Sequence, residues 1–512
     1  MVPLVSFASQ PAQAASCGTG GVARCTLGSL NGLDVKKFAD DIANGIEAKK
    51  PVGYAVAVVD RDGNNVLELS AGHAVRPADP IFTIQFDINA RSDIGSVSKV
   101  ITEAIVRHGI EMTEDLPAYS SCKVHLDTKF LDVLPSVFAE VDTSGYYDDV
   151  TIQQVLGHKA GVPNNLGADP YGNPYDYWIT MRRPDGYRNC EKGSYCYSND
   201  NYVLATMMVG MIFSCGAKPS WDGLLAAMCA GKPAGREEQT CQIQNAYTLL
   251  AGLSNETVRD MIMSPFDVSA SCDYQTDFLD AGIPVAKGYT DRNDPHGDYA
   301  WLDVRGCGVG QWHMSARSLA KVMRYLHQGT FFFHKQSADA LPDTFNGGHD
   351  NFVSRIQNLD SLQVAFESNT PISQTEVGAI ISSAYQNARV NGTVIGTSPP
   401  VLDQVRGAWD CKRSGSSATM RLQVASRNDI RGYHLADFGG EGSNELWSYS
   451  SNGSSSASGT YVYYKTTSNP REDQTWSGTW KLSRQSNGTL RVTRRDDATG
   501  WTGDYTCQSG TP

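Results

Sequence analysis

Apolar positions in the first part of the chain fall in two short continuous runs. They lie at 54–59 and 66–69, with the turn formers Asp62-Gly63 between them. This pattern predicts two buried strands joined by a hairpin. Strand-like runs return near 352–366, and 375–388 has the spacing of an amphipathic helix. The outer parts of this region are therefore expected to form one antiparallel sheet with helices.

The intervening residues, from about 112 to 306, are richer in helix-like and loop segments. Their apolar stretch 202–213 has the length of a buried core helix rather than of a membrane span. We expect a helical lobe inserted between the strands, so the predicted fold class is α+β.

A change of composition after residue 388 predicts a second domain. The turn formers at 391–393 and 398–400 indicate a linker. Short alternating runs separated by Gly, Ser and Asn follow at 420–424, 460–464 and 489–492. They predict a small antiparallel β-barrel or sandwich. The expected domains are 17–398 and 405–512.

Charge and hydropathy exclude two classes of partner. The 512 residues carry a formal net charge of −12, and no clustered basic face is visible, which argues against a nucleic-acid partner. The sequence contains no run of 18 or more apolar residues, so no membrane-spanning helix is predicted. Residues 1–16 contain the small-x-small site Ala12-Gln13-Ala14 but no charged n-region, and we interpret them as a residual signal peptide. A secreted or periplasmic protein is expected.

The cysteines point to the same compartment. All twelve are scattered singly, without the spacing of a zinc site, which favours disulfides in an oxidising environment. Proximity along the chain and the domain limits suggest the pairs Cys17–Cys25, Cys190–Cys196 and Cys411–Cys507.

The candidate chemistry begins at Gly95-Ser96-Val97-Ser98-Lys99, which opens an apolar-periodic stretch. Residues i and i+3 of a helix share a face, about 4.5 Å apart along the axis. A serine hydroxyl thus meets a lysine amine, which can take its proton only when the amine is neutral. Ser98 is discounted as the nucleophile because the lysine directly follows it.

Two further elements follow in a fixed order, Tyr197-Ser198-Asn199 and Gly347-Gly348. Together with the Ser-x-x-Lys motif they resemble the β-lactamase-like serine hydrolase superfamily, which includes class C β-lactamases, esterases and D-peptidases. Other segments are similar to that family as well, among them DIGSVSKVITEAIVRHGIEMTEDL, VTIQQVLGHKAGVP and CGVGQWHMSARSLAKVMRYL. The resemblance runs from about 52 to 388. It implies an α/β sandwich of an antiparallel sheet flanked by helices.

The resemblance also implies residue roles. Ser96 would be the nucleophile and Lys99 the base for acylation. Tyr197 would share protons with the nucleophile and the leaving group, as one coupled unit with the lysine. Asn199 would hold the lysine and hydrogen-bond the substrate's carbonyl.

The third motif departs from the family pattern. Relatives have Lys, His or Trp followed by x-Gly, whereas this chain has Asn346-Gly347-Gly348. The two glycines suit a strand that approaches the substrate closely, and the backbone N–H of His349 would complete an oxyanion hole with that of Ser96. In another register His349 is itself the polar residue of the motif. A plain hairpin turn without a catalytic part is a further alternative.

Loss of the motif cation favours uncharged acyl substrates, so we expect an esterase or amidase acting on a small-molecule or peptide substrate. The alternatives are a D-amino-acid peptidase, a D,D-carboxypeptidase or a β-lactamase, and a non-catalytic or slowly acylating module that binds a peptide or peptidoglycan. The sequence has no G-x-S-x-G nucleophile elbow and no paired histidines for a metal, so we expect neither an α/β-hydrolase nor a metal or other cofactor.

Overall fold

The structure is a computed structural model in which the chain divides into two compact units. The first comprises 1–99, 263–324 and 343–395, and the second comprises 100–262, 325–342 and 396–512. The residues described are 13–19, 21, 23–61, 63–78, 83–115, 123–141, 145–162, 173–182, 190–214, 218–266, 268, 270–272, 285–300, 304–327, 331–332, 334–360, 362–390, 407–414, 419–424, 430–434, 443–452, 456–465, 474–485, 487, 489–497 and 502–509.

An antiparallel sheet forms the first unit. Its strands run in the order β1-β2-β4-β3-β11-β10-β9, with β5 pairing to β4. Their bounds are β1 Gln13–Cys17, β2 Ala23–Leu27, β3 Gly53–Val59, β4 Asn65–Val75, β5 Ile84–Gln85, β9 Thr344–His349, β10 Phe352–Leu359 and β11 Leu362–Ser368. The predicted hairpin and the later strands are thereby confirmed, and the sheet joins chain segments that are far apart in sequence.

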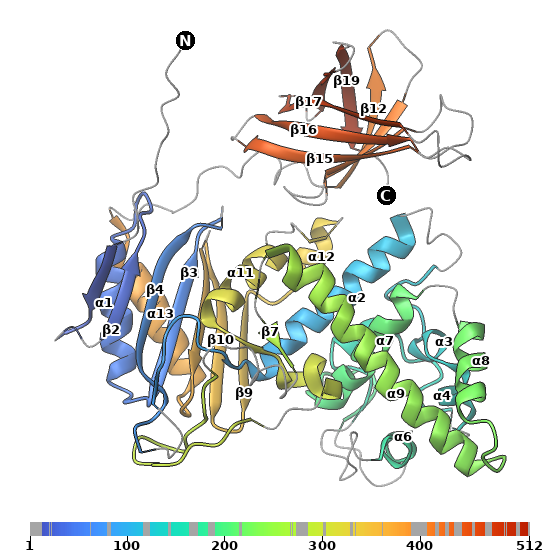
Figure 1. The fold of residues 1–512 in the computed structure, drawn as a ribbon, viewed down its shortest axis with the longest axis horizontal. Coiled ribbons are helices and arrows are strands. Elements are labelled where there is room, and N and C mark those ends of the chain that lie inside the picture. Colours follow the sequence, from blue (N-terminus) through green and yellow to red (C-terminus); the bar gives the residue numbers. More distant parts are fainter. Residues whose placement is uncertain are drawn as a thin grey trace. The chain divides into compact units, whose positions relative to one another are not determined.

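Helices α1 (Val35–Glu47) and α13 (Gln374–Ala388) cover one face of this sheet (Figure 1). The predicted helix at 375–388 is confirmed. Apolar side chains of both helices and of the strands below them form one core, which includes Phe38, Ile42, Val56, Leu67, Leu69, Val364, Phe366, Ile381 and Tyr385. Along each strand these core residues occupy every second position, because successive side chains point to opposite faces of a sheet.

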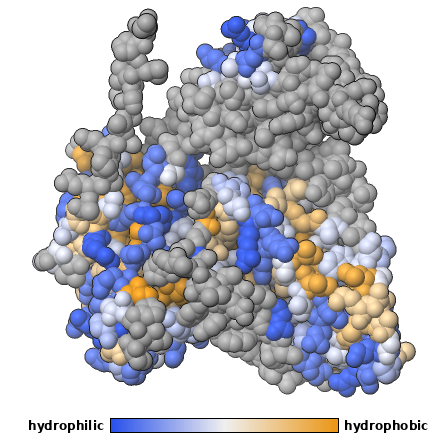
Figure 2. All heavy atoms as spheres, viewed as in Figure 1, coloured by the Kyte–Doolittle hydropathy of each residue, from blue (hydrophilic) through white to orange (hydrophobic). Residues whose placement is uncertain are grey.

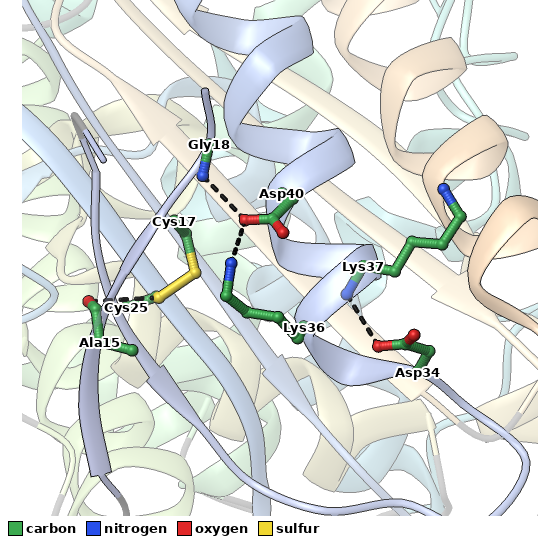
Figure 3. The surroundings of a disulfide bond; sticks show 8 residues. All are labelled: Ala15, Cys17, Gly18, Cys25, Asp34, Lys36, Lys37 and Asp40. Carbon is green, nitrogen blue, oxygen red and sulfur yellow. Dashed lines mark hydrogen bonds and ion pairs between the residues drawn. A yellow bond between two sulfur atoms is a disulfide. The ribbon is translucent and has the colours of Figure 1, made fainter. Parts of the chain in front are cut away.

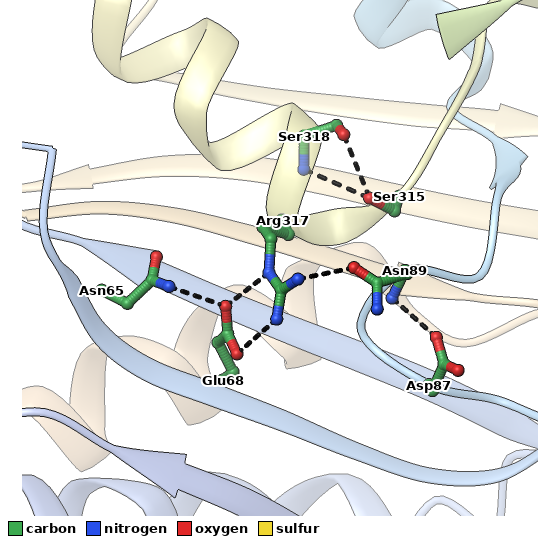
Figure 4. A network of polar contacts seen from close by, with 7 residues as sticks. All are labelled: Asn65, Glu68, Asp87, Asn89, Ser315, Arg317 and Ser318. Atoms are coloured by element: carbon green, nitrogen blue, oxygen red, sulfur yellow. Dashed lines mark hydrogen bonds and ion pairs between the residues drawn. The ribbon is translucent and has the colours of Figure 1, made fainter. Parts of the chain in front are cut away.

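The opposite face meets helix α11 (Ala316–His327) through polar side chains. Glu68 lies between the core residues of β4, and both of its carboxylate oxygens accept from Arg317, Nε at 2.6 Å and Nη2 at 2.7 Å (Figure 4). Asn65 donates to the same carboxylate, and Arg317 also donates to Asn89. The hydrogen bonds that Arg317 donates to the Glu68 carboxylate raise the pKa of its guanidinium.

Replacing Arg317 with methionine is expected to lower the free energy of unfolding by about 2–4 kcal/mol, because the Glu68 carboxylate would stay buried without its cation. The urea midpoint of unfolding, at unchanged slope, measures this loss. Lys36→Met removes the exposed partner of Asp40 (Figure 3) and should change stability by less than about 1 kcal/mol. Equal shifts in the two variants would contradict the structural role given to Arg317.

The first two strands extend the sheet at its N-terminal side. β1 pairs with β2, and the Cys17–Cys25 disulfide joins them next to α1 (Figure 3). The backbone N–H of Gly18 donates to Asp40 on that helix. Residues 13–16 therefore belong to the sheet, which begins before the domain boundary expected at residue 17.

Short elements carry the chain around the sheet. β6 (Ser92–Asp93), β8 (His313–Met314) and β7 (Ala270–Ser271) form a small sheet in the order β6-β8-β7. The helical turns η5 (Val304–Gly306) and η6 (Cys307–Gln311) precede β8. The disulfide Cys272–Cys307 ties β7's end to η6.

Helices make up most of the described part of the second unit before residue 396, as the sequence predicts. Helix α2 (Ser98–Asp115) begins in the first unit and continues into the second. The others are α3 Phe130–Val133, α4 Ser136–Glu140, α5 Ile152–Leu156, α6 Pro174–Arg182, α7 Asn199–Phe213, α8 Lys218–Met228, α9 Arg236–Val258 and α12 Lys335–Asp339. The turn η3 (Arg259–Met263) ends where the chain returns to the first unit, and η4 (Ser264–Phe266) belongs to that unit. The apolar stretch 202–213 is confirmed as a buried helix within α7.

On the surface of this unit, Leu224 and Met228 of α8 are exposed, and apolar residues gather there in Figure 2. Among the described residues no single helix has the length and apolarity to cross a membrane; only the sharply bent pair α7 and α8 meets that test when the two are taken together.

The C-terminal segment forms a closed antiparallel barrel, the first of the two architectures predicted for it. Its strands are β12 Gly407–Arg413, β13 Thr419–Val424, β14 Ile430–His434, β15 Ser443–Asn452, β16 Ser456–Lys465, β17 Gln474–Arg484, β18 Leu490–Asp496 and β19 Thr502–Ser509. The first and last strands pair, and the disulfide Cys411–Cys507 links them directly across that pair. Trp409 and Trp480 are buried, as expected of core residues.

The three disulfides suggested by the sequence, Cys17–Cys25, Cys190–Cys196 and Cys411–Cys507, are all present. Two more, Cys229–Cys241 and Cys272–Cys307, join residues whose pairing the sequence left open. Cys122 and Cys215 lie outside the described residues.

Candidate active site

Ser96 lies in a tight turn at the start of α2. The short 3₁₀ helix η1 (Gly95–Val97) directly precedes the α-helix, and Asp93 accepts the Gly95 N–H at 2.6 Å. Gly95 has φ +51°, and a Cβ there would lie 2.6 Å from the backbone nitrogen of Gly348. Only glycine fits this position, since both the backbone angle and the close approach exclude a side chain.

Lys99 is the buried partner of Ser96. Its Nζ lies 2.9 Å from Ser96 Oγ and 2.5 Å from the backbone oxygen of Val309 in η6. The lysine is 1% exposed, and burial disfavours an ammonium group relative to an amine. The predicted contact between nucleophile and base is therefore present in the structure, on the helix face that the spacing indicated.

The edge strand β9, which carries the Gly-Gly element, packs directly on the nucleophile turn. It pairs with β10 in the register Gly347↔Ser354 and Gly348↔Val353. A Cβ on Gly347 would lie 2.0 Å from the oxygen of Ile94 and 3.0 Å from the nitrogen of Val97. The strand thus makes the close approach expected of it, although the contact is with the turn of Ser96. Its catalytic part remains a prediction.

His349 ends β9 and contacts the same turn. Its Nδ1 lies 2.5 Å from Oδ2 of Asp93, whose side chain is buried. The hydrogen bond to that carboxylate raises the pKa of His349 above the ordinary histidine value. Asp93 therefore joins the nucleophile turn, through Gly95, to the end of the edge strand.

Asn346 lies on the other face of β9. Its Oδ1 accepts from Nη1 of Arg355 at 2.6 Å, and Arg355 also donates to the backbone oxygen of Gln374 at the start of α13. A Cβ on Gly348 would likewise approach Gln374, at 3.3 Å from its Nε2. Since strand side chains alternate, Gly347 and His349 lie on the face of β9 that contacts the nucleophile turn, at Ile94, Val97 and Asp93, and Asn346 lies on the other face.

Tyr197 and Asn199 lie together in the second unit, at the start of α7. Ser198 is the N-cap of the helix and accepts the Asp200 N–H, as expected of serine there. The Tyr197 hydroxyl donates to Oδ1 of Asn199 at 3.5 Å, and the tyrosine is 37% exposed. The Cys190–Cys196 disulfide closes the loop that leads into Tyr197.

His158 supports this tyrosine, a residue whose role the sequence reasoning missed. Its ring centre lies 4.7 Å from that of Tyr197, and its Nδ1 accepts the Ser198 N–H at 3.2 Å. His158 belongs to the segment VTIQQVLGHKAGVP that resembles the family, and that resemblance was the only available signal.

The structure thus groups the predicted residues in two sets. Ser96, Lys99, Gly347, Gly348 and His349 meet in the first unit, whereas Tyr197 and Asn199 meet in the second. Asp93 and the Val309 carbonyl, both in contact with the first set, were also missed. Asp93 is not part of any motif found in the sequence, and a backbone oxygen cannot be identified from the residue type. Among the described residues no group of three His, Cys, Asp or Glu is arranged to hold a metal ion.

Comparison with known proteins identifies a family for part of the chain. Residues 38–218 match the family model described as Beta-lactamase, a segment that includes Ser96, Lys99, Tyr197 and Asn199. No curated protein matches the chain.

Several solved structures resemble the chain in fold. The octameric penicillin-binding protein homologue from Pyrococcus abyssi is 14% identical, with 93% of this chain and 100% of that chain covered and a TM-score of 0.48. A class C beta-lactamase from Rhodobacter sphaeroides is 15% identical, with 69% and 98% covered and a TM-score of 0.47. The D-amino acid amidase from Ochrobactrum anthropi SV3 is 15% identical, with 69% and 100% covered and a TM-score of 0.46. We take no residue role from these likenesses.

Proposed function

From the premise that this chain belongs to the beta-lactamase superfamily, through residues 38–218, we propose that it is a serine hydrolase whose nucleophile is Ser96. Members of this family are serine hydrolases. The observation that carries the proposal is the 2.9 Å distance between Ser96 Oγ and the Nζ of a lysine that is 1% exposed. A neutral amine at this distance accepts the hydroxyl proton as the oxygen attacks an acyl carbon.

Two backbone amides would stabilise the oxyanion that forms. The first is the N–H of Ser96, at the start of a helix whose dipole favours negative charge. We assign the second to Gly348 rather than to His349, because the Gly348 nitrogen is the atom that comes nearest to a Cβ built on Gly95. The catalytic contribution of β9 is then its backbone, which explains why glycine suffices there.

Tyr197 and Asn199 complete the proposed machinery. The tyrosine would pass a proton to the leaving group, coupled to Lys99, and Asn199 would bind the lysine and the substrate's carbonyl. Support comes from the order of the motifs and from the packing of His158, which together with the Cys190–Cys196 disulfide restrains the tyrosine. We further propose that the hydrolase domain, whose sheet begins at residue 13, extends to residue 398 and that the barrel at 405–512 is appended to it.

The proposed substrate is an ester or amide with a largely neutral acyl group. The motif position that carries a cation in relatives is Asn346, which faces Arg355 and α13. The ring of His349 is compensated by Asp93, so it adds no net charge to the site. An unpaired charge able to attract a substrate carboxylate is therefore missing from the described part of β9. The five disulfides found among the described cysteines support a secreted or periplasmic location.

Covalent labelling with a fluorophosphonate, combined with turnover of a short p-nitrophenyl ester, tests this proposal. The wild-type chain should label on Ser96, as peptide mass spectrometry would show, and should hydrolyse the ester. Ser96→Ala should lose both properties, while Ser98→Ala should still label. Ser98 is the suitable control because its hydroxyl accepts the Trp312 N–H and has a structural part.

The other outcomes separate the alternatives. Activity retained in Ser96→Ala would refute the assignment. Labelling without turnover would identify a slowly acylating binding module, and no labelling would identify a binding protein. Faster cleavage of D-peptides or β-lactams than of neutral esters would place the chain with the peptidases or β-lactamases.

A further inference from the structure

A histidine and an aspartate form a hydrogen-bonded pair beside the nucleophile turn, and the proposed acylation step uses neither side chain. Asp93 Oδ2 lies 2.5 Å from Nδ1 of His349, while its Oδ1 accepts the Gly95 N–H at 2.6 Å. The Asp93 side chain is fully buried, and that of His349 is 34% exposed. The pair thus has one end fixed in the protein and one end open to solvent.

This arrangement fixes the tautomer of the imidazole. An ionised carboxylate only accepts hydrogen bonds, so Nδ1 carries the proton that is donated to Asp93. In the neutral ring, Nε2 then presents its lone pair. Nε2 makes no hydrogen bond with any described residue, and the ring is partly exposed. The nitrogen is therefore available to a water molecule or a substrate.

The position of the ring relates it to the reacting centre. His349 directly follows Gly348, whose nitrogen lies against Gly95, and it shares a strand face with Gly347, which touches Ile94 and Val97. Successive Cα atoms are about 3.8 Å apart, so the ring stands beside the turn that presents Ser96.

We propose that His349, oriented by Asp93, is the general base that activates water for hydrolysis of the acyl-enzyme. This inference rests on the proposed function of Ser96. The water oxygen forms a bond to the acyl carbon as one of its protons moves to Nε2, and the resulting imidazolium is stabilised by Asp93. The C–Oγ bond then breaks, a proton relayed through water returns from Nε2 to Ser96 Oγ, and the free acid leaves.

The charges around the ring set the pH at which this step works. Asp93 and Asp350, the latter with its carboxylate 4.0 Å from Nδ1, both raise the pKa of His349, whereas burial and the charge of Lys99, when that amine is protonated, lower it. Behind Asp93, Ser92 donates to the fully buried Glu367, whose pKa burial raises well above the usual range. The hydrogen bond to Asp93 outweighs burial and Lys99 and raises the pKa of His349. The base is protonated and inactive below that pKa, so deacylation should rise with pH through a midpoint above 6.5.

Burst kinetics with a p-nitrophenyl ester separate the two half-reactions. In His349→Asn the side-chain amide still donates to Asp93, but the second ring nitrogen is gone. We expect the initial burst of p-nitrophenol at a rate within about threefold of wild type, followed by a steady state slowed by about 10²–10⁴-fold, the usual contribution of a general base. The acylated protein should accumulate and be visible by intact mass. His296→Asn, a change at an exposed histidine outside the site, is the control and should leave both phases unchanged.

The pH dependence of the steady-state rate distinguishes a general base from a residue with a structural role only, because loss of a structural residue would leave the midpoint of the profile unchanged. The steady-state rate of wild type should rise with pH through the midpoint above 6.5, and His349→Asn should lose that limb. A variant with an unchanged steady state, or with burst and steady state slowed equally, would overturn the role given to His349 while Ser96 remains the nucleophile. A wild-type chain with no burst and no label on Ser96 would instead refute the proposed function itself.

Discussion

Lys99→Met is expected to reduce kcat/KM for a neutral ester by about a thousandfold or more, because it removes the base that accepts the serine proton. Methionine keeps much of the length and the apolar volume of the side chain, so the surrounding core should persist. The variant also deprives the Val309 carbonyl of its donor, and an unsatisfied buried carbonyl costs about 1–3 kcal/mol. Stopped-flow acylation rates and the thermal midpoint should therefore both fall, the first far more than the second.

Lys99→Arg provides the control that separates the base from the charge. A guanidinium retains hydrogen-bond donors for Ser96 and Val309 but does not give up its proton in a protein. If the lysine acts as a neutral base, the arginine variant should be almost as inactive as the methionine variant. An arginine variant with more than about a tenth of wild-type activity would show that positive charge, rather than proton transfer, is what Ser96 requires.

The local parts of this site could be predicted from the sequence because they depend on short spacings. Helical periodicity places Ser96 and Lys99 on one face whatever the rest of the chain does, and their contact is found. The same holds for the disulfide between Cys190 and Cys196, which are close in sequence. The family resemblance inferred from these motifs agrees with the match of residues 38–218 to the family model described as Beta-lactamase.

The third motif shows where such reasoning ends. It lies outside the matched segment, and the sequence left its register open between alternatives. A shift of one residue moves every side chain of a strand to the other face, so the register decides whether Asn346 or His349 faces the nucleophile. The pairing of β9 with β10 places His349 on that face and Asn346 with Arg355. The sequence contains no local signal that would have decided between them.

The Asp93–His349 pair was unpredictable for a different reason. The two residues are separated by 256 positions, and they meet only because the sheet brings its edge strand against the nucleophile turn. No motif spacing in the sequence predicts that either residue has a role in the site, and an aspartate such as Asp93 is common in a turn before a helix. The Val309 carbonyl is less visible still, since any residue type would offer the same oxygen to Lys99.

Gly347→Ala should cost nearly as much activity as loss of the base, although it removes no functional group. The added methyl group would lie 2.0 Å from the oxygen of Ile94 and 2.3 Å from Oγ of Ser354, and the first of these is rigid backbone. The edge strand must then move away from the turn that carries Ser96. A displacement of about 1 Å in a reacting geometry is enough to cost about a hundredfold in rate, so we expect kcat/KM to fall by about 10²–10³-fold.

Gly348→Ala on the same strand is the matched control. It shows whether activity is lost because β9 moves away from the nucleophile turn or because the strand tolerates no side chain at all. Its Cβ would meet the flexible end of Gln374 at 3.3 Å, on the face away from Ser96, so the strand can stay in place. Its loss of activity should be at least tenfold smaller than that of Gly347→Ala, with the burst of acylation still detectable. Equal losses in the two variants would mean that the strand tolerates no side chain on either face, and that the contact of Gly347 with the nucleophile turn does not by itself set the rate.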